Sequence, residues 1–380
     1  MFLKTVMERN QPLVRLGIEW QQNGVILPDT YLLDYDTILE NARSIKQAGD
    51  ANGVQNFFML KQIGRNPLIA RALTDMGYVG AVCVDFREAL TMVENQIPLG
   101  NVGHLVQIPR AALKKILRAK PVIVTVYTLE KAREISAVCT ELGLHQKLML
   151  RVLGEGDMLY SGQYGGFELQ ELDSAVRAIE AMPNVEVGGV CSFPCFLYDE
   201  AAQDILPMPN LRTVQTAAEM LRARGYRDLM LNTPSATCTH SIPMIAAAGG
   251  THGEPGHGLT GTTPYHAGHP DAEERPGYLY VSEVSHNLGD KAYCYGGGHY
   301  RRGHMKNALV GTTPENAKVV PVLPPDDSSI DYHFELQQNC PVSAAAVMAF
   351  RTQFFVTRSR VAVVKGLSSG KPELAGLYSA

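Results

Sequence analysis

Long hydrophobic runs, tryptophan and charge of either sign are all scarce in this chain. No apolar stretch approaches the roughly 20 residues that a membrane-spanning helix needs, and the first residues lack the ordered regions of a signal peptide. We therefore expect a cytoplasmic protein that has no membrane partner. The single tryptophan, Trp20, lies in a segment that predicts an N-terminal docking helix.

The charge balance gives no sign of a polyanionic partner. The formal net charge is -4, the pI is near 6.3, and no Lys/Arg run or aromatic-interleaved basic stripe occurs. Seven cysteines are scattered along the chain without a CxxC pair, which is typical of reduced thiols in a protein core. We therefore set aside nucleic acid as a partner and disulfide bonds as a framework.

Apolar, β-branched runs alternate with segments of helical periodicity from about residue 54 to residue 254. Asp85 and Thr128 stand where helices between these runs should begin. Eight such runs in about 200 residues predict an α/β fold, a (β/α)8 TIM barrel, whose active sites lie at the carboxyl ends of the strands. The predicted strands are Gln55–Leu60, Val79–Cys83, Val102–Val106, Val122–Val126, Lys147–Val152, Val185–Cys191, Asp228–Leu231 and Gly250–Glu254.

The remainder of the chain predicts a different architecture. Residues 260–274 are dense in Gly, Thr, His and Pro, which favours a long loop. Beyond it, strand-like segments with little helical periodicity predict a C-terminal β domain, which the Tyr31–Asp34 strand can join. We predict a barrel with an N-terminal extension in residues 1–270 and the β domain in residues 271–380. The strands expected in it are Tyr278–Val284, Lys291–Tyr295, Ala317–Val322, Val347–Thr357 and Arg360–Lys365.

Lys61 ends the apolar run of the first predicted strand, and its sequence neighbours offer no carboxylate. A partly desolvated lysine loses its proton readily and can form a Schiff base with an aldehyde cofactor. The alternative is a lysine that extends its ammonium group to solvent from a strand end.

Two loops that follow the seventh and eighth predicted strands are suited to binding phosphate. After the eighth strand, Glu254 is followed by a glycine-rich run that includes Gly256, and such a run exposes backbone N–H groups to an anion. After the seventh strand, Thr233 and Ser235 offer hydroxyl groups just before a helix. Barrels often bind phosphate between these two strands, which favours a functional reading over two ordinary connecting loops.

The same segments resemble a known family. Phe58–Pro67, Asn232–Thr237 and Glu254–Gly256 are similar to the fold-type III pyridoxal 5'-phosphate (PLP) proteins, the alanine racemase-like group that also includes basic amino-acid decarboxylases. Within that group, Gly103–Pro109 and two later segments, Asp326–Tyr332 and Phe350–Gln353, most resemble the YhfX-type proteins. The resemblance covers nearly the whole chain and implies a PLP-binding barrel.

Individual roles follow from this resemblance. It implies that Lys61 forms the Schiff base with PLP, that Ser235 contacts the cofactor phosphate, and that the backbones of Gly256 and His257 do so too. Glu254 stands where the racemases carry an arginine and the decarboxylases a glutamate that faces the pyridine nitrogen. A carboxylate keeps that nitrogen protonated and makes the ring a better electron acceptor, so Glu254 widens the range of reactions beyond racemisation.

Other positions near the strand ends are candidates for contact with the cofactor. Ser192 takes the place of a histidine that packs near the cofactor ring in many relatives, so ring placement can rely on His104 instead, or on another group. Arg151 and Gln163 can orient the cofactor hydroxyl or a substrate carboxylate, since a guanidinium group binds carboxylate with two hydrogen bonds. For His104 and Arg151 the alternatives are a structural histidine and a solvent-exposed arginine.

Racemisation requires a second acid or base on the face opposite Lys61. In the racemases this is a tyrosine from the neighbouring subunit, which implies a homodimer with shared active sites. Tyr295 and Tyr300 are the best candidates, with Cys340 and Arg351 further along the chain. A core or interface role is the alternative for each tyrosine.

Histidines cluster around the glycine-rich run, so a metal site is a further alternative. Their spacings match no familiar zinc pattern, and no cysteine lies among them. We therefore expect a polar loop lining and no metal cofactor. The histidines are His252, His257, His266 and His269.

The sequence thus predicts a PLP-dependent enzyme, an isomerase that racemises or epimerises an amino acid at its α-carbon. A decarboxylase or aldolase-type lyase is the alternative that Glu254 favours. A non-catalytic PLP-binding protein that serves cofactor supply is a second alternative. Single-barrel relatives of that kind lack a C-terminal domain, whereas this chain carries one.

Overall fold

The structure is a computed structural model that describes residues 2–379, and the chain forms two compact units. The barrel unit comprises residues 43–60 and 67–256. The β unit comprises residues 2–42, 61–66 and 257–379. Each unit has its own sheet.

The barrel unit is built on parallel strands. The segment 55–59 holds two short strands, of which β2 pairs with β13 and β3 pairs with β4, so the sheet nearly closes on itself. The predicted barrel is therefore confirmed. Its strands are β2 (Gln55–Asn56), β3 (Phe58–Met59), β4 (Ala81–Cys83), β5 (Leu99–Val102), β6 (Ile123–Val126), β7 (Gln146–Leu153), β9 (Val185–Cys191), β12 (Met230–Asn232) and β13 (His252–Gly253).

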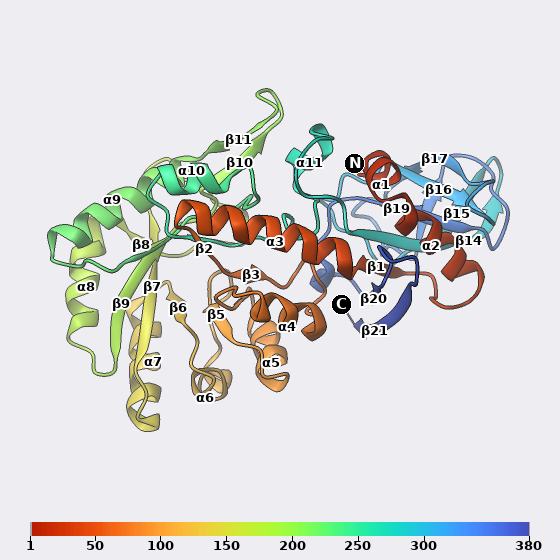
Figure 1. Cartoon of the computed structure of the whole chain (residues 1–380). Coiled ribbons are helices and arrows are strands. Elements are labelled where there is room, and N and C mark those ends of the chain that lie inside the picture. The colour runs from red at the N-terminus through yellow and green to blue at the C-terminus, as the bar shows by residue number, and fades with distance from the viewer. Residues whose placement is uncertain (1, 380) are drawn as a thin grey trace. The chain divides into compact units, whose positions relative to one another are not determined.

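Helices cover the outside of these strands (Figure 1). Each is amphipathic: in α6, for example, Leu113 and Ile116 are buried while Lys114 is exposed. The two predicted caps are confirmed, because Asp85 accepts a hydrogen bond from Glu88 N at 2.9 Å and Thr128 accepts one from Lys131 N at 3.3 Å. The helices are α3 (Tyr35–Asn52), α4 (Pro67–Asp75), α5 (Phe86–Glu94), α6 (Arg110–Arg118), α7 (Leu129–Leu142), α8 (Leu172–Glu180), α9 (Pro209–Ala223) and α10 (Ile242–Ala247).

One strand of the barrel is displaced from its predicted position. The prediction was Val102–Val106, whereas β5 ends at Val102. Gly103 has φ +92°, which breaks the extended backbone, and Gln107 Nε2 donates to both Gly103 O (2.8 Å) and Thr125 O (2.9 Å). Residues 103–107 therefore form a loop at the carboxyl end of β5, and His104 lies in that loop. The other predicted strands differ from the observed ones by at most two residues at either end.

Short elements interrupt the loops of the barrel unit. After β9 the chain forms a hairpin in which β10 and β11 pair antiparallel, and a short strand after β7 pairs with β7 itself. These elements are β8 (Phe167–Glu168), the 3₁₀ helix η1 (Leu169–Glu171), β10 (Phe196–Asp199) and β11 (Asp204–Pro207).

The β unit contains a closed ring of antiparallel pairings. It runs through β14, β15, β18, β17, β16 and β19 and returns to β14. The predicted N-terminal strand does join this sheet, because β1 pairs antiparallel with β14 and parallel with β20. The strands are β1 (Thr30–Asp34), β14 (Tyr278–Leu288), β15 (Lys291–Tyr295), β16 (Asn307–Gly311), β17 (Lys318–Leu323), β18 (His333–Leu336), β19 (Ala345–Met348), β20 (Arg360–Lys365) and β21 (Glu373–Ser379).

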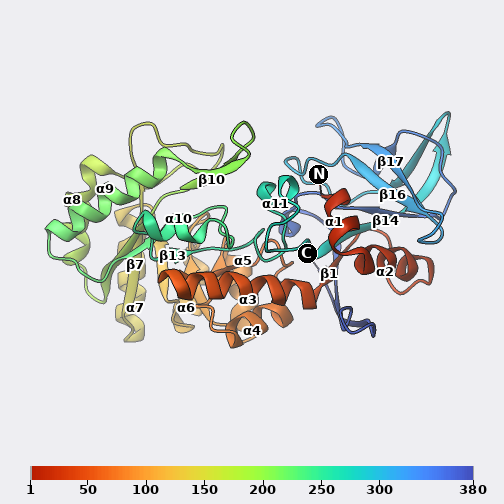
Figure 2. The ribbon, with the colours of Figure 1, turned by 45° about the horizontal axis from the view of Figure 1, so that its top comes forward.

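The N-terminal helices α1 (Leu3–Arg9) and α2 (Gln11–Gln22) pack on this sheet, close to β14 (Figure 2). Their apolar face, which includes Leu13 and Ile18, forms one core with Leu279 and Val347. Trp20 packs against the edge of that core, so the predicted docking helix is confirmed. No helix within residues 2–379 has the length and apolar character to cross a membrane.

Two predictions for the β unit were wrong. A strand was expected over Val347–Thr357, but β19 ends at Met348 and is followed by the 3₁₀ helix η2 (Phe354–Val356). The aromatic ring of Phe354 stacks on Tyr31 at 4.2 Å, which holds this segment outside the strand ladder. Within the loop expected over residues 260–274, α11 (Pro264–Gly268) forms with a capping box between Thr263 and His266.

Candidate functional site

At the carboxyl end of the barrel strands lies a buried carboxylate, Glu254. It follows β13 directly, and its Oε1 accepts hydrogen bonds from Asn232 Nδ2 at 2.6 Å and from Asn101 Nδ2 at 3.3 Å. Its backbone N–H donates to Thr237 Oγ1 at 3.1 Å. Glu254 is therefore held by side chains from three other places in the barrel unit.

His104 contacts the same carboxylate. Its Nε2 lies 3.7 Å from Glu254 Oε2, and its Nδ1 lies 3.8 Å from Cys191 Sγ at the end of β9. The imidazole meets the ring of Phe193 edge to face, with the centroids 5.7 Å apart. Burial raises the pKa of Cys191 to about 12, so this thiol is protonated at neutral pH. His104 thus lies in the loop at the carboxyl end of β5, not within the strand predicted there.

Arg151, on β7, is completely buried. Its Nη1 donates to Tyr127 Oη at 2.9 Å and its Nη2 donates to Gln163 O at 2.8 Å. The guanidinium group also lies over the Tyr127 ring, 4.9 Å from the centroid. Within residues 2–379 it makes no ion pair, and its Nε has no hydrogen-bond partner. A buried cation in this condition is suited to binding an anionic ligand.

Tyr127 connects the two groups just described. Its hydroxyl donates to His104 O at 2.5 Å and accepts from Arg151. Burial raises the pKa of Tyr127, and the charge of Arg151 offsets that rise only in part. The structure thus brings together four of the candidate residues, His104, Arg151, Gln163 and Glu254.

The loops after the sixth and seventh strands hold the other barrel candidates. Ser192 is buried and accepts a hydrogen bond from Asn210 Nδ2 at 3.1 Å, while Ser235 Oγ donates to Phe196 O at 2.8 Å. Thr233 differs from both, because its hydroxyl is buried and has no hydrogen-bond partner among residues 2–379. An unsatisfied buried hydroxyl in a loop before a helix is the donor expected of a site that binds phosphate. Gly256, at the end of the barrel unit, is also buried.

The residues of this region fit PLP. The cofactor offers a phosphate for the Thr233 hydroxyl, a ring nitrogen for the Glu254 carboxylate and a phenolic oxygen for the Arg151 guanidinium group. Each of these three side chains is buried and carries a polar atom suited to that group.

In the β unit, Lys61 lies beside the segment that carries Arg351. The backbone N–H of Phe354 donates to Lys61 O at 2.9 Å, and the lysine side chain is only 8% exposed. Arg351 Nε in turn donates to His257 Nε2 at 3.2 Å. The structure therefore brings Lys61, Arg351 and His257 together within one unit.

His257 is a neutral imidazole in this setting. Its Nε2 accepts from Arg351, so its proton sits on Nδ1, which lies 3.1 Å from Thr262 Oγ1. Burial, together with the positive charges of Arg351 and Lys61, holds the pKa of His257 well below its usual value. The sequence prediction gave His257 only a backbone role, and it missed the contact between its side chain and Arg351.

The two tyrosine candidates differ in their surroundings. Tyr295 ends β15 and is 39% exposed. Tyr300 is half-buried. Its backbone carbonyl accepts a hydrogen bond from Gly303 N at 2.7 Å, and Gly303 O in turn accepts one from Arg351 N at 2.9 Å. The Tyr300 segment is therefore tied to Arg351 through one glycine. Cys340, the further candidate, bonds instead to Asn287, at the far end of β14.

The clustered histidines serve separate contacts. His252 stacks on Phe57 in the barrel unit, with the centroids 5.1 Å apart. His266 pairs with Glu274 at 3.0 Å, and His269 stacks on a tyrosine. Among residues 2–379, no group of three or more His, Cys, Asp or Glu side chains is placed to hold one metal ion.

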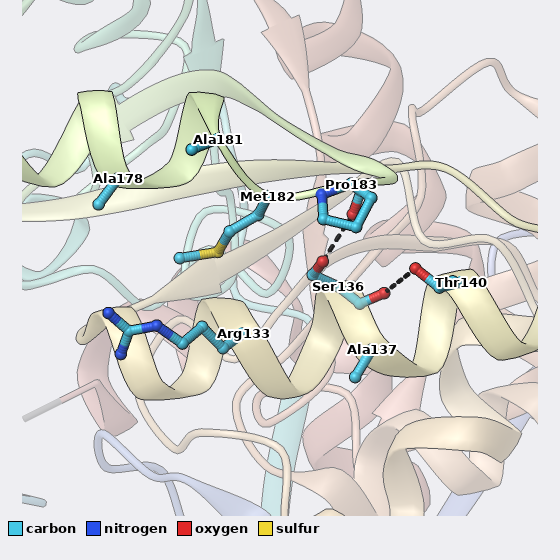
Figure 3. A pocket seen from close by; sticks show the side chains of 8 residues that line it. All are labelled: Arg133, Ser136, Ala137, Thr140, Ala178, Ala181, Met182 and Pro183. Carbon is cyan, nitrogen blue, oxygen red and sulfur yellow. Dashed lines mark hydrogen bonds between the residues drawn. The ribbon is translucent and has the colours of Figure 1, made fainter.

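A surface groove of about 620 Å³ lies elsewhere, between α7 and α8 (Figure 3). Ser136 Oγ donates to Pro183 O across it at 2.6 Å. Pro183 precedes β9, so the groove lies toward the amino ends of the strands, away from Glu254. It contains none of the predicted site residues.

Comparison with known proteins agrees with the fold. The family described as "Alanine racemase, N-terminal domain" matches residues 33–264, and that described as "YhfX-like, C-terminal domain" matches residues 279–374. The uncharacterised protein YhfX of Escherichia coli (strain K12) is 43% identical over 380 residues, which is 100% of this chain and 98% of that protein.

Solved structures show the same fold at low identity. D-threonine aldolase from Filomicrobium marinum is 16% identical with a TM-score of 0.68, and covers 92% of this chain and 94% of its own. Alanine racemase from Clostridium difficile 630 is 14% identical with a TM-score of 0.65, and the match covers 93% of this chain and 98% of that chain. D-threo-3-hydroxyaspartate dehydratase from Delftia sp. HT23 is 14% identical with a TM-score of 0.64, covering 92% and 96%.

Proposed function

The chain belongs to the alanine racemase-like, fold-type III family, whose cofactor is PLP, and on that premise we propose that it is an enzyme acting at the α-carbon of an amino acid. The observation that carries this proposal is Glu254, a buried carboxylate at the end of the eighth barrel strand with one oxygen fixed by two amides. PLP, when bound, withdraws electrons from the bond that breaks at the α-carbon.

The barrel residues orient the cofactor and the substrate. Glu254 supplies the negative charge that keeps the ring nitrogen protonated. Thr233 would donate its hydroxyl proton to the phosphate, and Ser235 would do so on giving up its bond to Phe196 O. The backbone N–H groups of Gly256 and His257 would complete the phosphate contacts. Arg151, whose guanidinium group is held by Tyr127 and by the Gln163 carbonyl, binds the cofactor hydroxyl or the substrate carboxylate. His104 would pack near the ring, in the role that Ser192 cannot fill.

Lys61 supplies the amine that holds the cofactor aldehyde. With a substrate bound, the same amine would be placed to move a proton at the α-carbon. Its backbone bond to Phe354 and the packing of its segment fix where the side chain begins. This positioning is what proton transfer over a short distance requires.

Racemisation or epimerisation is the reaction we propose first, because a proton at the α-carbon is the ordinary target in this branch. It needs a tyrosine opposite Lys61, and we favour Tyr300 over Tyr295, since the Tyr300 segment bonds to that of Arg351. Following the racemases, we propose that this tyrosine acts in a second copy of the chain, so that the enzyme is a homodimer.

A lyase is the second candidate, and Glu254 favours it. A carboxylate at the ring nitrogen strengthens electron withdrawal and so permits loss of carbon dioxide or cleavage of the bond between Cα and Cβ.

The experiment that separates these reactions incubates the PLP-loaded protein in deuterated buffer with a panel of amino acids. Deuterium uptake at the α-carbon with inversion supports the isomerase. Release of carbon dioxide or of an aldehyde, with deuterium entering the cleavage product at that carbon but not the recovered substrate, refutes the isomerase and supports the lyase. If PLP binds but every amino acid is unchanged, catalysis is refuted and a role in cofactor supply is supported.

A further inference from the structure

Two asparagines, on strands that are not neighbours in the barrel sheet, meet at one oxygen of Glu254. Asn101 lies on β5 and Asn232 ends β12, and both side chains are completely buried. Both donate to Oε1, at 3.3 and 2.6 Å. Because both amides are shielded from water, their two hydrogen bonds act on the carboxylate in a low-dielectric setting.

A third residue bonds to the other end of the Asn101 amide. Thr125 Oγ1, on β6, donates to Asn101 Oδ1 at 2.7 Å. A carboxylate can only accept, so the NH₂ group of Asn101 faces Glu254 and its amide oxygen is left to accept from Thr125. An oxygen that accepts from Asn101 and Asn232 at once has no room for a proton of its own. The remaining oxygen, Oε2, lies near His104.

We propose, resting on the function proposed above, that Asn101 and Asn232 are positioning residues that hold Oε1 of Glu254 as an acceptor only and leave Oε2 to the cofactor's ring nitrogen. The protonation of that nitrogen is then set by two neutral amides that never touch the cofactor. Because amides do not titrate, both side chains can donate to Oε1 whatever the pH.

The test measures the ring nitrogen directly. The wild-type protein is loaded with PLP labelled with ¹⁵N in the ring, and the ¹⁵N chemical shift is followed as a function of pH. Asn101→Leu and Asn232→Leu keep the branched shape of the side chain, at a somewhat larger volume, but donate nothing. Each lost bond to a carboxylate is expected to lower the pH midpoint for loss of the ring proton by about one to two units.

Asn41→Leu is the matched control. Asn41 is an equally buried asparagine of the β unit that donates to Leu259 O and Arg275 O. Its replacement is expected to leave the ¹⁵N midpoint at the wild-type value. If the leucine variants of Asn101 and Asn232 do not fold, as judged by circular dichroism, Thr125→Val removes the hydroxyl that bonds to Asn101 and to the Cys191 thiol. It is then expected to lower the midpoint by a smaller amount.

The outcomes separate this inference from the function on which it rests. Variants that bind PLP and keep the wild-type midpoint overturn the role of the asparagines and leave Lys61 and Glu254 in place. A ring nitrogen without a proton in the wild-type protein overturns the roles of both Glu254 and the asparagines, while the cofactor remains bound. Failure of the wild-type protein to bind PLP overturns the proposed function itself.

Discussion

Replacing Glu254 by leucine is expected to destabilise the protein more than replacing it by glutamine, in the absence of cofactor. Leucine leaves the amide donors of Asn101 and Asn232 buried without an acceptor. Each buried unsatisfied donor costs about 1–3 kcal/mol, so Glu254→Leu is expected to lose about 2–6 kcal/mol of unfolding free energy. Glutamine keeps an amide oxygen in place of Oε1 and removes a buried charge, so its loss is expected to stay below about 1.5 kcal/mol.

The assay is urea-induced unfolding followed by far-ultraviolet circular dichroism on the two variants and the wild-type protein. Glu219→Leu, on the exposed face of α9, serves as the control for the change from glutamate to leucine. It is expected to remain within about 0.5 kcal/mol of the wild type. Equal unfolding free energies for Glu254→Leu and Glu254→Gln would refute the reasoning, because the two asparagines would then have no dependence on an acceptor at this position.

Three further outcomes are expected. Borohydride reduction followed by peptide mass spectrometry should find PLP attached at Lys61, and Lys61→Ala should abolish this attachment while Lys114→Ala, on the surface of α6, should not. Burial lowers the pKa of His252 to about 4, so between about pH 6.5 and 4 the unfolded chain binds a proton that the folded chain does not. The unfolding free energy should therefore fall by about 3 kcal/mol as the pH is lowered across this window. His252→Gln should reduce that loss. Deuterium uptake at the substrate α-carbon should slow at least about 100-fold in Tyr300→Phe, and a larger loss in Tyr295→Phe would assign the proton transfer to Tyr295 instead.

The sequence was sufficient for most of the barrel because its strands are continuous apolar runs buried on both faces. β9, at Val185–Cys191, has the bounds that its β-branched residues predict. β5 was misplaced because the loop that ends it depends on Gln107, whose side-chain amide bonds to the backbone of the neighbouring strand β6. Such a contact is absent from any local pattern. The helix starts at Asp85 and Thr128, by contrast, are set by side chains that cap the helix locally.

The β unit was harder to predict for the same reason. β16, β18 and β21 were missed, since their sequences are short and become strands only when paired with neighbours far along the chain. The wrong strand over Val347–Thr357 followed from its apolar composition. In the structure that apolar character serves an aromatic cluster around Tyr31 and Phe354.

For the candidate site, the sequence could find residues that stand at strand ends or in glycine-rich loops. Lys61 and Glu254 were of this kind. Asn101 and Tyr127 were not, because their roles come from the side chains they meet across the barrel. A polar residue within or just after a buried strand is the one signal that could have identified them, since such a residue needs a partner.

The contacts of Lys61 show that the position of a residue in the chain does not decide in which of the two units it packs. Lys61 follows β3 by two residues, yet residues 61–66 group with the β unit. Phe354 N bonds to Lys61 O, and Arg65 lies over the ring of Phe355 at 5.4 Å. Gly64, at φ +66°, packs so closely on Val361 that an added Cβ would lie 2.7 Å from its methyl group. The placement of the proposed catalytic amine therefore depends on residues of the C-terminal sheet, which a barrel-only relative would lack.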